Sequence, residues 1–269
     1  MLIKFGFELV VTTSSNHVQI SNAKVLKVDL LDPRTWVHNE LKSPFDFVLH
    51  AASHSPTTLD PQFIDANYIN PLDFFSRIRF SAKCKFVFCS TSGVYGLSFT
   101  GNFTEYSTPN PSDIYSKSKL LFEENISEVI LSNGSTGHLL ILRIPTLLGV
   151  RVSQNLIHRW IDASKKGEGI RVFNSGYSFA TLILEQHIVE RIKQELTLSN
   201  SRKSIENCYS NGDLTFLEAA TLVAQQFHSN VQIIDAEYDV PVLSLINLKN
   251  TWFNNLSSKL SLQIFLSKL

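Results

Sequence analysis

Two groups that can exchange protons lie four positions apart in IYSKSKLLFEE (114–124): the phenol of Tyr115 and the ammonium group of Lys119. Residues at i and i+4 share one face of a helix. An ammonium group favours a nearby phenolate, so the pair is suited to acid-base chemistry. The alternative is a solvated helix face, on which the lysine stem covers the tyrosine ring.

A cluster of hydroxyl groups precedes this segment. The apolar run KFVFCS (85–90) leads directly into STSGVYG (90–96), in which hydroxyl side chains are followed by glycines. Ligands of open α/β sheets bind at the carboxyl ends of the strands. A later segment, LRIPTLLG (142–149), ends the next apolar run with proline and glycine, so its backbone leaves the sheet there.

Short apolar runs supply the strands that position these groups. They occupy residues 7–11, 25–30, 45–52, 85–90 and 138–145, and helical patterns at 61–80 and 112–133 lie among them. The runs do not alternate strictly, which predicts strands buried on both faces of a parallel sheet. The fold class is therefore α/β, with a doubly wound, Rossmann-like sheet.

The pattern changes after about residue 150. Helices are predicted at 154–167, at 214–227 with a cap near Asp213, and in the terminal segment 246–260; a strand is predicted at 233–241. We expect a dinucleotide-binding domain over 1–150 and a smaller α+β substrate-binding lobe over most of 151–269.

Composition excludes several classes of partner. The chain has 269 residues, 24 basic and 24 acidic side chains and a pI near 7.1, so neither nucleic acid nor a membrane surface is an expected partner. No apolar run approaches the ~20 residues of a membrane span, and no signal peptide is visible. The odd set of Cys84, Cys89 and Cys208 has no metal spacing, so we predict no metal site and a reducing, cytoplasmic compartment.

Taken in order, several motifs resemble those of one family. They are VDLLD (28–32), DFVLHAAS (46–53), Asn67 in DANYIN, FVFCSTSGVYG (86–96), the Y-S-K-S-K of residues 115–119, and LRIPTLLG. Over nearly the whole chain the sequence resembles the extended short-chain dehydrogenase/reductases, the NAD-dependent epimerase/dehydratase family. The resemblance implies hydride transfer on a nucleotide sugar with NAD or NADP, and a homodimer formed through the helices at 61–80 and 112–133.

The same resemblance assigns catalytic roles. Tyr115 would be the acid-base group for a sugar hydroxyl or carbonyl, and Lys119 would lower the pKa of Tyr115 and bind the nicotinamide ribose. Thr91 would hydrogen-bond the reacting oxygen, with Ser92 as the substitute. The alternative for Thr91 is a hydroxyl group that satisfies its own turn.

Binding positions are carried over in the same way. Asp29 and Leu30 would meet the adenine, Asn67 would support the cofactor loop, and Pro145 would flank the nicotinamide. The loop itself would line the cofactor through the backbone of Ala51, Ala52 and Ser53. Ordinary packing at the end of a strand explains the presence of the two alanines nearly as well. Ser92 and Thr146 fall at substrate-binding positions; the family often has asparagine at the second. No acidic residue or arginine near the second strand decides between NAD and NADP.

Two departures from the family pattern limit these expectations. Family dehydratases carry Asp-Glu after the catalytic threonine, where this chain has Ser92 and Gly93, so dehydration is disfavoured. The family opens with a strand and a glycine-rich loop that cradles the pyrophosphate, whereas here no glycine lies between Gly6 and Gly93. The segment MLIKFGFELVV instead resembles the end of the family's first helix and its second strand.

We therefore expect the first strand and the glycine loop to be missing, either because the sequence is a shortened form or because it is a degenerate copy. The main hypothesis is an epimerase or reductase, impaired in binding its cofactor. The rival hypothesis is a non-catalytic binding or regulatory domain.

Overall fold

A computed structural model gives the structure of the chain and describes residues 7–15, 18–54, 62–96, 102–149, 155–177, 182–198, 203–210, 214–234, 244–245 and 253–269. The chain divides into two compact units. The first comprises 1–90, 113–141 and 192–204, and the second comprises 91–112, 142–191 and 205–269. Segments from both halves of the sequence enter each unit, and the predicted dinucleotide-binding domain over 1–150 and substrate-binding lobe over most of 151–269 stay predictions.

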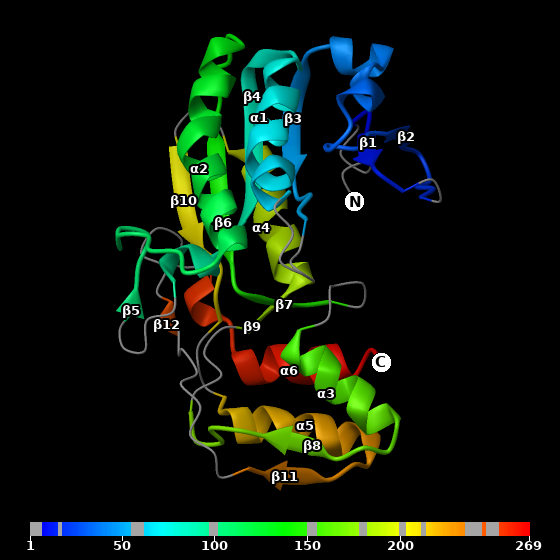
Figure 1. Cartoon of the computed structure of the whole chain (residues 1–269), viewed down its shortest axis with the longest axis vertical. Helices are drawn as coiled ribbons and strands as arrows, with labels where there is room; N and C mark the ends of the chain where they lie inside the picture. The colour runs from blue at the N-terminus through cyan, green and yellow to red at the C-terminus, as the bar shows by residue number, and fades with distance from the viewer. Residues whose placement is uncertain are drawn as a thin grey trace. The chain divides into compact units, whose positions relative to one another are not determined.

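A four-stranded sheet organises the first unit. Its strand order is β10 (Lys203–Asn207), β6 (Leu139–Ile144), β4 (Phe80–Thr91) and β3 (Phe45–His50), which places consecutive strands β3 and β4 together (Figure 1). Strands β3 and β4 run parallel, with Val48 opposite Phe86 and His50 opposite Phe88. The predicted parallel α/β architecture is thereby confirmed.

A separate pair of strands belongs to the same unit. Strand β1 (Val10–Thr13) runs parallel to β2 (Lys24–Lys27), and together they form a two-stranded sheet. The predicted strands at 7–11 and 25–30 correspond to this pair. Whether a first strand of the family is missing stays a prediction.

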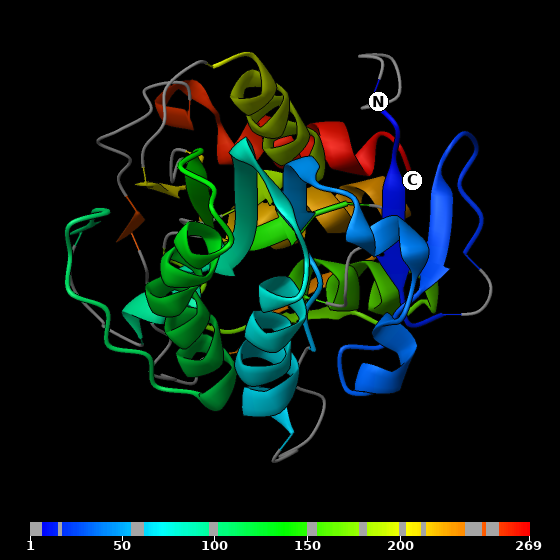
Figure 2. The same ribbon diagram turned by 90° about the horizontal axis from the view of Figure 1, so that it is seen from above.

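Two helices lie side by side on one face of the four-stranded sheet, as Figure 2 shows: α1 (Asn70–Ser76) and α2 (Ile114–Ser132). A π-helical turn over Asp65–Ile69 leads into α1. The predicted helix at 61–80 is too long at its end, because the backbone N–H of Phe45 donates to the carbonyl of Arg79 at 2.9 Å and draws the chain into the sheet. Helix α2 matches its prediction closely.

The helices and the sheet enclose an aromatic core. Phe75 contacts Phe74, Phe86 and Phe122, with ring centroids 5.0–6.2 Å apart in edge-to-face geometry. Edge-to-face pairs add to the stabilisation that burial of such rings supplies. The phenylalanines of α1, β4 and α2 thus fix the helices against the sheet.

The second unit is built of helices and short strand pairs. Its helices are α3 (Leu156–Lys165), α5 (Phe216–Phe227) and α6 (Ser258–Leu266), and its parallel strand pairs are β7 (Thr146–Leu148) with β9 (Leu182–Leu184), β8 (Ile170–Val172) with β11 (Val231–Ile233), and β5 (Asn102–Phe103) with β12 (Ser244–Leu245). Their apolar side chains form one buried core, which includes Ile157, Leu182, Val223 and Leu262.

Two predicted helix boundaries in this unit were wrong. Helix α5 is capped by Thr215, whose hydroxyl accepts from the N–H of Glu218 while the Glu218 carboxylate accepts from the N–H of Thr215; Asp213 lies outside the described residues. This reciprocal capping box satisfies two donors at once. The terminal helix α6 begins at Ser258, because Ser257 caps it. Much of the predicted strand at 233–241 and of the segment 246–260 lies outside the described residues.

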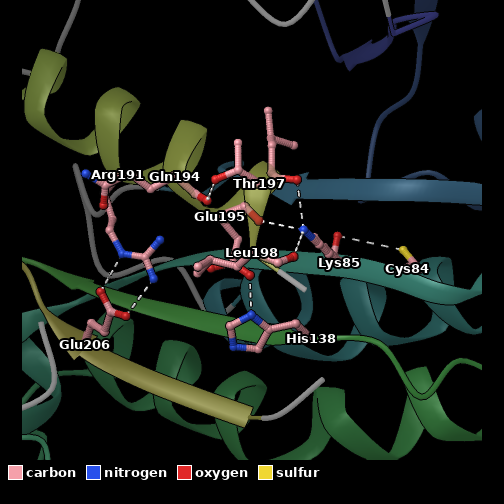
Figure 3. A network of polar contacts seen from close by, with 10 residues as sticks. Cys84, Lys85, His138, Arg191, Gln194, Glu195, Thr197, Leu198 and Glu206 are labelled. Carbon is pink, nitrogen blue, oxygen red and sulfur yellow. Dashed lines mark hydrogen bonds and ion pairs between the residues drawn. The ribbon is translucent and has the colours of Figure 1, made fainter. Parts of the chain in front are cut away.

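Helix α4 (Glu185–Thr197) begins in the second unit and ends in the first. At its end, the ammonium group of Lys85 donates to the carbonyls of Glu195 at 2.8 Å and Leu196 at 2.9 Å, and also to that of Leu198 (Figure 3). A cation at a helix C-terminus satisfies carbonyls that have no partner within the helix and complements its dipole. The buried Glu195 carboxylate also contacts Nδ1 of the buried His138.

A buried ion pair lies at Arg191 in the second unit. Its guanidinium group donates through Nε and Nη2 to the two carboxylate oxygens of Glu206, each at 2.7 Å (Figure 3). Both side chains are at most 5% exposed. Two parallel hydrogen bonds of this kind join α4 to β10 within the unit.

We expect Arg191→Met to lower the free energy of unfolding by about 3–5 kcal/mol, because Glu206 would keep a buried charge without its partner. Urea denaturation followed by circular dichroism measures the change. Arg34→Met is the matched control: Arg34 also pairs with an acidic residue, Asp32, but is 90% exposed, and its loss should leave the midpoint unchanged. Equal effects of the two substitutions would contradict a special role of burial.

Candidate active site

Tyr115 and Lys119 lie one turn apart at the start of α2. The carboxylate of Asp113 caps the helix, accepting from the N–H and the hydroxyl of Ser116, each at 2.8 Å. Tyr115 is half-buried, whereas Lys119 is only 2% exposed. The alternative of a solvated helix face therefore does not hold for Lys119.

The ammonium group of Lys119 has an unusual environment for a lysine. Its Nζ lies 4.6 Å from the centroid of the Phe88 ring, a cation–π contact. Burial lowers the pKa of Lys119 from 10.5 to about 8, opposed by the nearby groups Cys89 and Glu123. Lys119 is therefore a group whose charge changes close to physiological pH.

The carboxylate of Glu123 is held in place beside it. Glu123 is 2% exposed and accepts a hydrogen bond from the hydroxyl of Ser90, at the end of β4. Its main-chain carbonyl accepts from Nζ of Lys203 at 3.2 Å. The Glu123 carboxylate and the Ser90 hydroxyl thus share the interior with Lys119, whereas Lys203 of β10 is exposed and contacts the main chain of α2.

The phenol of Tyr115 does not have the lowered pKa that its neighbour predicts. Burial raises the pKa of Tyr115, and the carboxylate of Asp113 and the thiol of Cys89 raise it further. A hydrogen bond with the Ser53 side chain acts in the opposite direction. Desolvation of the phenol therefore outweighs the favourable contact with Ser53, and the effect that Lys119 would have on the pKa of Tyr115 stays a prediction.

The segment after β3 lies next to this phenol. Ala51, Ala52 and Ser53 are exposed, and the short side chains of the alanines leave the backbone accessible. The buried side chain of Asn67 fixes the following residue: its Oδ1 accepts from the N–H of His54 at 2.7 Å, and its Nδ2 donates to the carbonyl of His54 at 3.0 Å. Asn67 therefore contacts the loop as expected, while the binding of a cofactor by that loop stays a prediction.

Asp29 and Leu30 follow β2 and differ in what they can offer a ligand. The Asp29 carboxylate accepts from the N–H of Leu31 at 2.9 Å, and its carbonyl accepts from Nε1 of Trp36 at 2.7 Å, so Asp29 stabilises its own turn. Leu30 lines an apolar cavity of about 450 Å³ together with Ala51 and Ala52. The structure thus brings three of the predicted cofactor residues to one cavity.

His50 is a residue of this region that the sequence analysis missed. Its ring packs 5.1 Å from Phe75, 5.4 Å from Phe88 and 5.0 Å from Phe122, measured between centroids. Burial, and then the charge of Lys119, hold the pKa of His50 well below 6.5, so the imidazole is neutral. Its position directly before Ala51 in the quoted motif was the available signal.

Thr91 and Ser92 belong to the second unit. The Thr91 hydroxyl accepts from the N–H of Gly93 at 3.1 Å and so caps the short 3₁₀ turn over Ser92–Tyr95. This is the contact that the alternative interpretation of Thr91 requires. Ser92 is 7% exposed. The catalytic role of Thr91 stays a prediction.

The loop after this turn is fixed by a polar network that sequence reasoning also missed. The Tyr95 hydroxyl accepts from Nη1 of Arg143 at 2.8 Å and lies 2.7 Å from Oδ1 of Asn207. The Glu105 carboxylate accepts from the N–H of Asn207 at 3.1 Å. Gly96 has φ +80°, and a Cβ there would lie 2.0 Å from the carbonyl oxygen of Asn110, so only glycine fits.

Pro145 and Thr146 lie at the end of β6 in the second unit. Pro145 separates β6 from β7, and Thr146 begins β7 opposite Leu182. Both are half-buried. The chain leaves the first sheet at the predicted place, while the ligand contacts of both residues stay predictions.

Comparison with known proteins gives a consistent result. The model of the NAD dependent epimerase/dehydratase family matches residues 2–181. No curated protein matches. Among solved structures, UDP-glucose 4-epimerase from Thermotoga maritima, bound to UDP-glucose, has a TM-score of 0.77 and 16% identity, over 99% of this chain and 92% of that one.

Two further enzymes share the fold. UDP-glucuronic acid 4-epimerase from Bacillus cereus, in complex with NAD, has a TM-score of 0.75 and 16% identity, covering 93% of this chain and 82% of that one. ADP-L-glycero-D-manno-heptose-6-epimerase from Helicobacter pylori has a TM-score of 0.74 and 17% identity, covering 97% and 87%. In the described part of this chain, no helix is long and apolar enough to cross a bilayer.

The lowered pKa of Lys119 predicts how the free energy of unfolding changes with pH. Between about pH 8 and pH 10.5 the unfolded chain keeps a proton that the folded chain has released, so the contribution of Lys119 to the free energy of unfolding rises with pH. We expect a gain of up to about 3 kcal/mol across this range, which Lys119→Met should remove. Urea denaturation at a series of pH values measures it. Lys117→Met, which removes an exposed lysine of the same helix, is the control, and identical profiles for the two variants would refute the assignment.

Proposed function

The chain belongs to the NAD dependent epimerase/dehydratase family, a family of enzymes, and from this premise we propose that it epimerises or reduces a nucleotide sugar with NAD or NADP. One observation carries the proposal. Lys119 is buried one helical turn from Tyr115, whose hydroxyl is hydrogen-bonded to Ser53 beside an accessible stretch of backbone. A buried lysine with a lowered pKa next to an acid-base group is characteristic of functional sites.

Proton transfer is the task proposed for the side chains. The Tyr115 phenol takes the proton from a sugar hydroxyl, or returns it to a carbonyl, and the Ser53 hydroxyl orients the phenol. The positive charge of Lys119 stabilises the phenolate as the proton leaves. The proposed role of Thr91, a hydrogen bond to the reacting oxygen, rests on the resemblance alone.

The dinucleotide fits part of the structure. Its nicotinamide would accept a hydride from the sugar and give it back. Lys119 and Tyr115 would hold the nicotinamide ribose, and the exposed backbone of Ala51–Ser53 would lie along the cofactor. The apolar side chain of Leu30, after β2, would contact one face of the adenine. The pyrophosphate is not accounted for, because residues 7–92 contain no glycine to form its usual cradle.

The substrate class follows from the same family. Solved structures with this fold hold UDP-glucose or are epimerases of UDP-glucuronic acid and of an ADP-heptose. We assign substrate contacts to Ser92 and Thr146 of the second unit. Dehydration is not proposed, because neither Ser92 nor Gly93 can protonate a leaving hydroxyl group.

A homodimer is part of the proposal. The family pairs its subunits through the helices that correspond to α1 and α2, and apolar side chains are exposed on and beside them here: Ile69 is 48% exposed and Leu131 is 61% exposed. Exposed apolar side chains of this kind mark surfaces of association. Sedimentation velocity of the wild type and of Leu131→Lys tests the dimer.

Cofactor binding is the first test of the function. Isothermal titration with NAD and with NADP should give weak but saturable heat, weak because residues 7–92 supply no glycine cradle for the pyrophosphate. Lys119→Met should weaken this binding about tenfold or more, because a charge-assisted hydrogen bond to the ribose is lost. Lys117→Met should leave binding unchanged. Absence of binding by either dinucleotide would overturn the assignment.

Turnover is the second test. We expect Tyr115→Phe to reduce the conversion of UDP-glucose in the presence of NAD by about 10²-fold or more, the usual contribution of a general acid-base group. Because the ring is retained, NAD binding should persist. Chromatography of the nucleotide sugars measures the conversion, and undiminished turnover in this variant would rule out Tyr115 as the proton-transfer group.

A non-catalytic binding domain is the second candidate. The raised pKa of Tyr115 favours it, since a phenol that resists ionisation is a poor base. Dinucleotide binding without turnover of any nucleotide sugar by the wild type would support this candidate over the enzyme.

A further inference from the structure

Strands β3 and β1 of the first unit each have one edge without a neighbouring strand in the described part of the chain. Strand β3 ends the four-stranded sheet, and β1 pairs with β2 alone. An open edge presents a row of main-chain donors and acceptors that another strand can pair with.

The ladder fixes the groups on β3. The N–H of Phe86 donates to the carbonyl of His138 at 2.8 Å, so the main-chain N–H and C=O groups of Phe86 point toward β6. Those of the adjacent residues, Lys85 and Val87, point toward β3. Val48, the residue opposite Phe86, pairs with those neighbours. The N–H and C=O groups of successive residues in a strand point to opposite sides, so those of Phe47 and Leu49 point away from β4 and have no strand beside them.

The same reasoning applies to β1. The carbonyl of Leu9 accepts from the N–H of Lys24 at 2.8 Å, and that of Thr13 accepts from the N–H of Val28 at 2.9 Å. Alternate residues starting at Leu9 therefore face β2. The main-chain groups of Val10 and Thr12 face away from it.

These four residues line one and the same cavity, of about 450 Å³. Among the described residues, its other walls are apolar apart from His50, and none of those that line it is an aspartate, glutamate, lysine or arginine. Leu49 is 39% exposed, whereas Val87, its partner in the ladder, is fully buried. Strand β3 is thus apolar in sequence and only partly covered, as expected of a strand that takes a neighbour on each side.

We propose that the space between β1 and β3, here called the strand slot, binds one extended apolar peptide segment as an added β-strand. The uncharged lining selects uncharged side chains, and the two open edges select a backbone that can pair on both sides. A strand that enters the slot must have both of its own edges free. The described sheet strands of a second copy do not meet this condition, since each already pairs with a neighbour.

The test uses the intact chain without any dinucleotide, so its outcome does not depend on the proposed function. The probe is a fluorescein-labelled peptide, Lys-Lys-Val-Ile-Val-Val-Thr-Lys-Lys-amide, and fluorescence anisotropy measures its binding. A second peptide carries N-methyl groups at alternate central residues. It keeps every side chain and loses the donors of one edge, so we expect about tenfold or more weaker binding.

Variants of the protein locate the site. Leu49→Lys places a charge in the slot and should weaken binding of the unmethylated peptide about tenfold or more. Val37→Lys is the matched control, because Val37 is 80% exposed and does not line the slot. Circular dichroism confirms that both variants are folded.

Three results of the peptide assay would each overturn the proposal: absence of saturable binding, equal affinity for the N-methylated peptide, and equal affinity in Leu49→Lys. A different result is that the chain self-associates without binding the peptide, and that Leu49→Lys abolishes this self-association. This result would assign the slot to a second copy of the chain and would also overturn the proposal.

Discussion

The first unit depends on keeping one ammonium group out of water. Lys119 is almost fully buried, and the groups that make this tolerable come from three elements: Phe88 and Ser90 from β4, Glu123 from α2, and His50 from β3. A buried charge needs partners, and a neutral histidine next to it avoids a second positive charge. The aromatic core that packs α2 against the sheet therefore also sets the electrostatics of the candidate active site.

In the second unit, buried hydrogen bonds fix the loop that follows β4. The segment after β4 has little regular structure, yet it is tied to Arg143 through Tyr95 and to Asn207 through both Tyr95 and Glu105. A buried network with paired members restricts a loop as effectively as a sheet does. The hydroxyl groups of Thr91 and Ser92 consequently stand on a rigid base, as a site that must hold a ligand in one orientation requires.

Sequence reasoning recovered the elements whose signal is local. The runs at 45–52 and 138–145 became β3 and β6, and the helical pattern over 112–133 became α2, with each end within two residues of the prediction. The family assigned from the ordered motifs is confirmed by the family match. The reasoning failed at the end of α1, which depends on a hydrogen bond between Arg79 and the distant Phe45. It also missed the cap of α5, although Thr215 and Glu218 form a local capping box that the sequence displays.

The same limit applied to the site. Burial of Tyr115 and Lys119 reversed the expected direction of one pKa, and burial is a property of the packed chain that spacing does not give. His50, Arg143 and Asn207 were overlooked because their importance lies in contacts with residues far along the sequence. Tyr95 stood in a quoted motif, but nothing local showed that its hydroxyl bonds to Arg143.

The two units are interleaved along the chain, which affects how the protein can be divided into fragments. The backbone passes from one unit to the other five times, inside β4, before α2, and inside β6, α4 and β10. No single cut of the chain separates the two units, because each is assembled from three segments that alternate along the sequence. Replacing one unit by that of a relative would therefore require exchanging three separate segments of the chain at once.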